Sequence, residues 1–185
     1  MPESSRQALL EEVNSYFTVN SNERAVVTFS VRSMLDLYLS VRKFPAGSEI
    51  IMTGINIPDM VQIMKEHKIK IVPVDLDFAT MQPSVNDIRK AISPNTKACL
   101  FAFIFGVTYD IAPYADILNS AGIEIIEDCA QSWRGLDKFR GSENSTMTMF
   151  SFGLIKYNTA FYGAVTIIKQ NNETHRSQGD KPLYQ

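Results

Sequence analysis

The chain has 185 residues, of which 45% are hydrophobic and 21% are charged, so it is long enough for one well-buried domain of ordinary soluble composition. Its formal net charge of −2, with no run of like charges, argues against nucleic acid or a membrane surface as the main partner. The polar start MPESSRQ is unlike a signal peptide, and the longest apolar run, ACLFAFIFGV, has about half the length needed to span a bilayer.

The first elements follow from apolar spacing. A helix is predicted at 3–17, within an N-terminal helical segment of residues 1–23, and its apolar stripe consists of Leu9, Leu10, Val13 and Phe17. A short apolar strand is predicted at 25–29. The helix after it is expected to turn one side inward, formed by Met34, Leu35, Leu37, Tyr38 and Val41.

Six more strands are predicted, at 49–52, 70–74, 98–104, 123–127, 146–152 and 163–168. Helices are expected between most of them. Pro58 suits the first turn of one helix, Ser84 and Asp87 form a capping pattern that opens another, and Gly122 ends a third at about residue 121.

This alternation predicts an α/β fold of three layers, with a mainly parallel seven-stranded sheet and helices on both faces. It extends over residues 24–170, which are expected to form one large domain. Residues 171–185 are polar and lack periodicity, so we expect a polar tail or a truncated linker there.

Polar side chains follow the predicted strand ends, where ligands of open parallel sheets bind. Arg32 and Ser33 lie at the start of the helix after the first strand, together with Ser30. The free N–H groups of a helix start suit a phosphate. The alternative is an ordinary serine cap beside a surface arginine.

Two other strand ends carry an acid, an amide and an amine. Asp128 and Gln131 follow the fifth strand, Ser151 lies at the end of the sixth, and Lys156 comes five residues later. A capping aspartate and a solvated lysine are the alternatives. Taken together, however, these groups match pyridoxal 5′-phosphate: lysine forms a Schiff base with the aldehyde and moves the α-proton, and aspartate keeps the pyridine nitrogen protonated.

The stretch IEIIEDCAQSW, followed by FSFGLIKYNTAFYGAVTII, strongly resembles the DegT/DnrJ/StrS aminotransferases, which are fold-type I pyridoxal-phosphate enzymes of the sugar aminotransferase type. FSVRSMLDLYL resembles the phosphate-binding turn of that family, and the resemblance covers residues 24–168. It implies that Lys156 carries the Schiff base, that Asp128 pairs with the ring nitrogen and that Gln131 contacts the ring oxygen. Ser151, Arg32 and Ser33 would hold the phosphate.

The resemblance also implies an aminotransferase of sugar amine biosynthesis, a homodimer that takes an amino group from an amino acid and gives it to a keto-sugar or similar ketone. The alternative is a truncated, catalytically weak or inactive relative that keeps the fold, with or without binding of the cofactor. Ile57, where an aromatic residue is usual, favours that alternative, as does Tyr162 in place of glycine. Val31 and Phe103 also depart from the family pattern, and its small C-terminal domain is expected to be absent.

A different nucleotide-binding α/β domain is the third hypothesis, and the absence of a G-x-G-x-x-G or P-loop sequence opposes it. Cys99 and Cys129 lie in apolar strand-like segments, and we expect buried thiols in a reducing, cytoplasmic compartment. His67 and His175 are isolated along the chain, so no metal site is expected.

Overall fold

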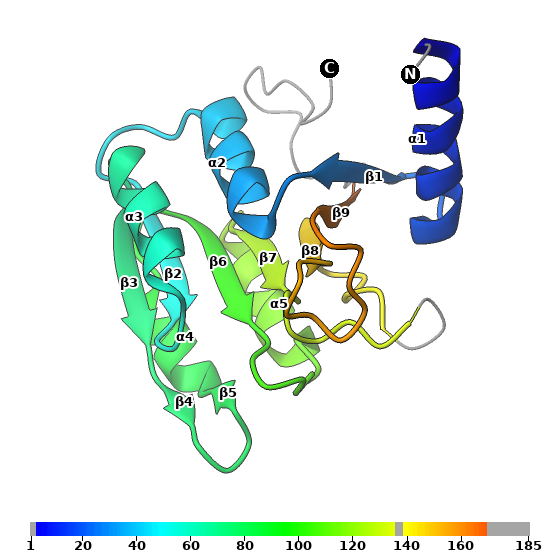
Figure 1. Cartoon of the computed structure of the whole chain (residues 1–185). Helices are drawn as coiled ribbons and strands as arrows, with labels where there is room; N and C mark the ends of the chain where they lie inside the picture. Colours follow the sequence, from blue (N-terminus) through cyan, green and yellow to red (C-terminus); the bar gives the residue numbers. More distant parts are fainter. Residues whose placement is uncertain (1–2, 136–138, 170–185) are drawn as a thin grey trace.

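Figure 1 shows the computed structural model of the chain, which describes residues 3–135 and 139–169. The tail predicted from residue 171 lies outside the described residues. Seven strands form one sheet in the order β1-β9-β8-β7-β6-β2-β3. Its strands are β1 (Glu23–Thr28), β2 (Glu49–Thr53), β3 (Lys70–Val74), β6 (Thr96–Ala102), β7 (Glu124–Asp128), β8 (Met147–Ser151) and β9 (Ala164–Lys169).

The sheet is mainly parallel, as predicted. The pairs β3–β2, β2–β6, β6–β7 and β7–β8 are parallel, whereas β9 runs antiparallel to both of its neighbours, β8 and β1. All strands except β9 therefore end at the same edge. Because β9 lies between β1 and β8, the residues after β1 are about 10 Å from those after β8, at about 4.8 Å per strand.

Helices cover both faces of the sheet, which confirms the three-layer prediction. The helices are α1 (Glu3–Phe17), α2 (Val31–Arg42), α3 (Pro58–Glu66), α4 (Val85–Ala91) and α5 (Ala112–Ser120). One core cluster joins α2 and α3 to the sheet through Met34, Leu35 and Met60, and the other joins α4 and α5 through Ile88 and Leu118. Both cysteines are free and buried, as expected.

A helix and a hairpin lie at the margins of the sheet. Helix α1 stands beside β1 (Figure 1), and Phe17 at its end stacks on Trp133 with ring centroids 5.3 Å apart. A short hairpin, β4 (Leu76–Asp77) and β5 (Gln82–Pro83), extends from β3. No helix among the described residues has the length and apolarity to cross a membrane.

The local signals for helix ends were mostly right. Pro58 occupies the first turn of α3, and Gly122 follows α5 with φ +67°, a conformation that glycine adopts without strain. Ser84 is the N-cap of α4, but its side chain makes no capping hydrogen bond, so the proposed capping pattern is wrong in that detail. Leu37 is also not an inward-facing residue of α2, because it is 38% exposed and Leu39 is buried in its place.

Candidate active site

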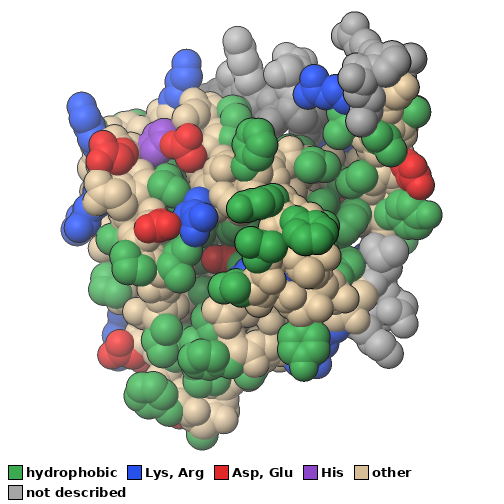
Figure 2. Space-filling view, in the orientation of Figure 1, with side chains coloured by type: hydrophobic (Ala, Val, Ile, Leu, Met, Phe, Trp, Pro, Cys, Tyr) green, Lys and Arg blue, Asp and Glu red, His purple; other side chains and the backbone are tan. Residues whose placement is uncertain are grey.

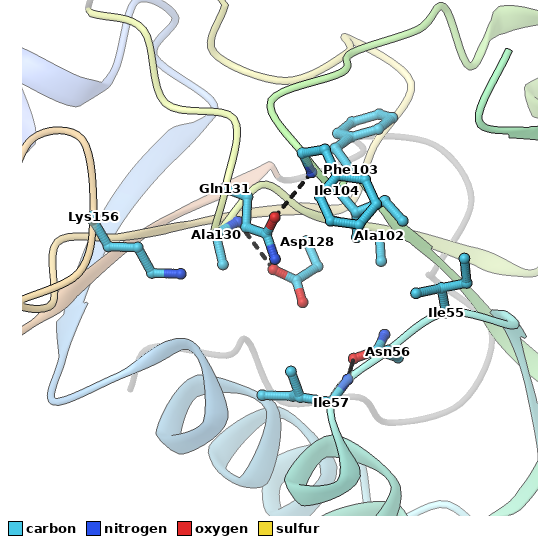
Figure 3. A pocket seen from close by; sticks show the side chains of 11 residues that line it. Ile55, Asn56, Ile57, Ala102, Phe103, Ile104, Asp128, Ala130, Gln131 and Lys156 are labelled. Atoms are coloured by element: carbon cyan, nitrogen blue, oxygen red, sulfur yellow. Dashed lines mark hydrogen bonds between the residues drawn. The ribbon is translucent and has the colours of Figure 1, made fainter. Parts of the chain in front are cut away.

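The carboxyl ends of three adjacent strands, β2, β6 and β7, surround a cavity of 210 Å³. Its walls come from the loop after β2, from the end of β6, from the residues after β7 and from Lys156 (Figure 3). The lining residues are Ile55, Asn56, Ile57, Ala102, Phe103, Ile104, Phe105, Asp128, Ala130, Gln131 and Lys156. A cavity therefore lies at the edge of the sheet where ligands of parallel sheets are expected to bind.

Asp128 ends β7 and projects into this cavity from the side of the sheet that α2 and α3 cover. One carboxylate oxygen accepts the Ala130 N–H at 3.0 Å, which orients the side chain. Burial raises the pKa of Asp128 to about 6, although the Ala130 N–H and the positive charge of Lys156 act to lower it. The site therefore holds a carboxylate that a cationic ligand would stabilise.

Glu127, the acid next to Asp128, is on the opposite face of β7, because strand residues alternate. Its carboxylate accepts the Ser142 N–H at 2.8 Å and the Thr148 hydroxyl at 2.9 Å. Burial raises the pKa of Glu127, and these hydrogen bonds oppose that shift. Glu127 thus holds the segment before β8 in place, and only one of the two acids faces the cavity.

Gln131 presents a defined face of its amide to the cavity. Its carbonyl oxygen Oε1 accepts the Phe105 N–H at 2.9 Å, so the amide nitrogen Nε2 remains as a donor. Phe105 has φ +57°, an uncommon conformation for a bulky residue, and it turns this N–H toward Gln131. No local pattern indicates this contact, because it joins segments 26 residues apart.

Lys156 lies in the loop 152–163 between β8 and β9, which we call the lysine loop. Its backbone N–H closes a turn on the Gly153 carbonyl at 3.0 Å, and Figure 3 shows its amine directed toward the cavity beside Ala130 and Asp128. A second cavity of 320 Å³ shares Ala130, Gln131 and Lys156 with the first and also contacts Ser151. The structure therefore brings Asp128, Gln131, Ser151 and Lys156 into one continuous region.

Arg32 and Ser33 lie apart from these four residues. Arg32 pairs with Asp59 at 3.3 Å and is 49% exposed. The Ser33 N–H donates to the Ser30 hydroxyl at 3.1 Å, an N-cap of α2, and Ser33 lines a third cavity beside Tyr162 and Gly163. The reason is topological: β9 and the residues that lead into it separate the end of β1 from the end of β8.

Three of the residues that depart from the family pattern lie in the first cavity or in the core. Ile57 lines the first cavity across from Asp128 (Figure 3), and Phe103 is buried there, edge-on against Tyr109 with ring centroids 4.6 Å apart. Val31 is buried in the core. Asn56 is a cavity residue that sequence reasoning missed, since a lone asparagine before Pro58 looks like an ordinary turn residue.

Comparison with known proteins identifies the family of this chain. A sequence model of the DegT/DnrJ/EryC1/StrS aminotransferase family matches residues 5–177. The chain belongs to that family. Within residues 3–135 and 139–169, no cluster of histidine, cysteine or acidic side chains has the arrangement of a metal site.

Curated members of the family are similar over most of this chain. A GDP-perosamine synthase of Escherichia coli is 26% identical over 153 residues, which are 80% of this chain and 42% of that protein. A 3-amino-5-hydroxybenzoate synthase of Amycolatopsis mediterranei is 26% identical over 165 residues, 85% of this chain and 42% of that protein. The chain thus spans less than half the length of these relatives.

Solved structures show the same fold. A sugar aminotransferase of Streptococcus pneumoniae in its PLP form superposes with a TM-score of 0.76 at 20% identity, over 89% of this chain and 45% of that one. An Escherichia coli GDP-4-keto-6-deoxy-D-mannose-3-dehydratase with hydrated PLP gives 0.75 at 19% identity, over 94% and 45%. Together with the family match, this confirms pyridoxal 5′-phosphate as the cofactor of the family.

Proposed function

We propose that this chain is the cofactor-binding part of a pyridoxal-phosphate-dependent aminotransferase, which moves an amino group from an amino acid to a keto-sugar or similar ketone. The observation that carries the proposal is that Asp128, Gln131 and Lys156 line one cavity. These residue types fit the cofactor, because the donor set contains an amine for its aldehyde, a carboxylate for its ring nitrogen and an amide N–H for its ring oxygen.

Bound pyridoxal phosphate supplies an aldehyde that takes up amines and a ring that accepts electrons. Asp128 would keep a negative charge against the ring nitrogen, and the Gln131 amide would donate to the ring oxygen. Lys156 would hold the aldehyde carbon through its Nζ, and its free amine would serve as general base and acid for a proton. Ser151, Arg32 and Ser33 would hold the phosphate, for which the start of α2 offers a positive dipole end.

A catalytically weak relative that keeps the fold is the second candidate. Two observations favour it: the guanidinium of Arg32 is engaged with Asp59, and Ser33 lines a cavity other than the one that contacts Ser151. Three groups proposed for the phosphate are therefore not gathered in this chain alone. The two candidates differ in turnover.

Purified protein supplied with pyridoxal phosphate is expected to develop a visible absorbance band that added glutamate converts to the spectrum of the pyridoxamine form. Complete conversion supports the aminotransferase. Uptake without conversion by any of the twenty amino acids supports the weak relative. Absence of the visible band at millimolar cofactor contradicts the aminotransferase.

We also propose that the chain acts as a homodimer in the cytoplasm; its buried free thiols fit a reducing compartment. Figure 2 shows hydrophobic side chains exposed on the face drawn. In the lysine loop, Leu154, Ile155, Tyr157, Phe161 and Tyr162 are all exposed, and Ile155 and Tyr157 line the second cavity. Large apolar side chains exposed beside a binding site are typical of a protein interface.

Ile155→Asp is expected to shift the protein from dimer to monomer, by at least 10-fold in the dissociation constant measured by sedimentation or light scattering. The reason is that Ile155 is 94% exposed and a buried unpaired carboxylate is costly in an interface. Phe78→Asp is the control, because Phe78 is 85% exposed in the β4–β5 hairpin, away from the site. If both variants and wild type have the same dissociation constant, the lysine loop is not the dimer interface.

A further inference from the structure

Arg32 and Asp59 form an ion pair between the first turns of two helices. The Arg32 guanidinium nitrogen Nη1 lies 3.3 Å from a carboxylate oxygen of Asp59. Arg32 is in the first turn of α2, and Asp59 is in the first turn of α3, directly after Pro58. The pair therefore links two helices that start at the carboxyl edge of the sheet, where the proposed cofactor site lies.

This ion pair spans the strands that carry the proposed catalytic groups. Helix α2 follows β1 and helix α3 follows β2, and the ends of these two strands are about 24 Å apart, because four strands lie between them. The core cluster that joins α2 and α3 to the sheet also contains Ile126 of β7 and Met149 of β8. Asp128 is on the same face of β7 as Ile126, because strand residues alternate. The Arg32–Asp59 pair thus bridges the two helices on the face from which Asp128 projects.

The helix dipoles favour the acid of this pair and disfavour the arginine. An anion is stabilised near a helix N-terminus, and a cation is destabilised there. Asp59 therefore suits the first turn of α3. Arg32 lies in the first turn of α2, which the structure describes in full and which contains no acidic residue. Arg32 thus depends on an anion from elsewhere, and Asp59 supplies it.

The ion pair is weak enough for Arg32 to change partners. Its 3.3 Å separation is longer than the roughly 2.7–2.9 Å of a charge-assisted hydrogen bond, and the Arg32 and Asp59 side chains are 49% and 64% exposed. Exposed ion pairs contribute little to stability, because water and salt screen them. A phosphate group carries roughly two negative charges and accepts two guanidinium N–H groups side by side, so it is the stronger partner for Arg32.

We propose that Asp59 competes with the phosphate of the cofactor for Arg32, so that the ion pair lowers the affinity of the site for pyridoxal phosphate. This inference rests on the proposed function and adds a residue that opposes cofactor binding. Asp59 neutralises the charge of Arg32 in this structure. A phosphate at the start of α2 takes the guanidinium from Asp59, and breaking the ion pair offsets part of the free energy of binding.

The test compares Asp59→Asn, which removes the competing charge, with Asp36→Asn as its matched control. An Asp36 carboxylate oxygen on α2 lies 2.8 Å from Nε2 of His67, the C-cap of α3. The control therefore removes another ion pair between the same two helices without releasing Arg32. The acids are 64% and 61% exposed, so neither substitution disturbs the core. For each protein we would measure the Tm and the Kd for pyridoxal phosphate and for pyridoxal, which lacks the phosphate.

Asp59→Asn is expected to bind pyridoxal phosphate about 2- to 5-fold more tightly than wild type, which is the range that an exposed ion pair provides. Its Kd for pyridoxal should not change, because pyridoxal has no phosphate to contact Arg32. Asp36→Asn should have wild-type values for both molecules. In an Arg32→Gln background, Asp59→Asn should change neither Kd, because the side chain for which the two anions compete is gone.

An affinity for pyridoxal phosphate in Asp59→Asn that equals or falls below that of wild type overturns the inference and leaves the proposed function intact. An equal gain for pyridoxal also overturns it, because Asp59 then does not act on the phosphate. A gain that persists in the Arg32→Gln background, or one that Asp36→Asn shares, means that Asp59 does not act through Arg32. If neither wild type nor Asp59→Asn takes up the cofactor at millimolar concentration, the inference and the proposed function fail together.

Discussion

Lys156→Ala is expected to abolish covalent attachment of pyridoxal phosphate. The cavity that contains Asp128 and Gln131 has Lys156 as its one amine among the described lining residues, so no neighbour can replace it. Borohydride reduction should trap about one cofactor per chain on wild type, because the amine attacks the aldehyde as a nucleophile, and none above background on the variant. Intact-mass measurement and the visible absorbance band report the difference.

The matched control for this variant is Lys65→Ala, which removes an exposed lysine from the last turn of α3. It should trap cofactor as wild type does. Digestion of the wild-type adduct should place the label on the peptide that contains Lys156. If Lys156→Ala and wild type carry the same label and have the same spectrum, the lysine is not the attachment site and the assignment fails.

Asp128→Asn is expected to make the cofactor-free protein more stable at pH 7. Burial raises the pKa of Asp128 from 3.8 to about 6, so above pH 6 the folded protein must hold a charge that burial disfavours. The difference between these two pKa values corresponds to about 3 kcal/mol of unfolding free energy. Asparagine has no such charge and keeps an oxygen for the Ala130 N–H.

The size of this effect depends on pH. Below pH 3.8 Asp128 is protonated in both the folded and the unfolded chain. Its charge then makes no difference between the free energies of unfolding of wild type and Asp128→Asn. Between pH 3.8 and pH 6 wild type progressively loses the stability that the bound proton provides. Above pH 6 the difference in free energy of unfolding between the two proteins has its full value. Urea unfolding at several pH values measures it.

The same substitution should weaken the cofactor site, since the amide cannot balance a protonated ring. In wild type, cofactor affinity should fall as the pH drops below about 6, because protonated Asp128 no longer attracts the ring nitrogen. Asp128→Asn should lack that step, which separates Asp128 from titration of the cofactor itself. A variant that is more stable without ligand and binds less tightly is the expected combination for a carboxylate retained for function.

Asp116→Asn, at an exposed position of α5, is the control and should change unfolding free energy by less than about 0.5 kcal/mol. A pH-independent difference between Asp128→Asn and wild type would show that the substitution acts through packing. Lower stability of Asp128→Asn at pH 7 would contradict the assignment of a destabilising buried charge.

Much of this molecule follows from the local sequence. Apolar runs such as 49–52 and 98–104 predict strands buried on both faces, because a parallel sheet covered by helices leaves no face for water. Proline at position 58 and glycine at 122 mark helix boundaries through their own backbone preferences. Boundary errors occur where packing decides, as at Leu37, whose apolar character does not reveal which side of α2 it faces.

The sequence by itself determined the chemistry available: an acid and an amide after one strand, an amine after another, each a property of a single residue. Only the tertiary structure decided which of these meet. Strand order brings Asp128 and Lys156 to one cavity and leaves Ser33 beyond β9, and the Phe105 N–H from a distant loop occupies the Gln131 amide oxygen, so that this side chain presents its donor. Such contacts depend on chain crossings far apart in sequence, so no local pattern encodes them.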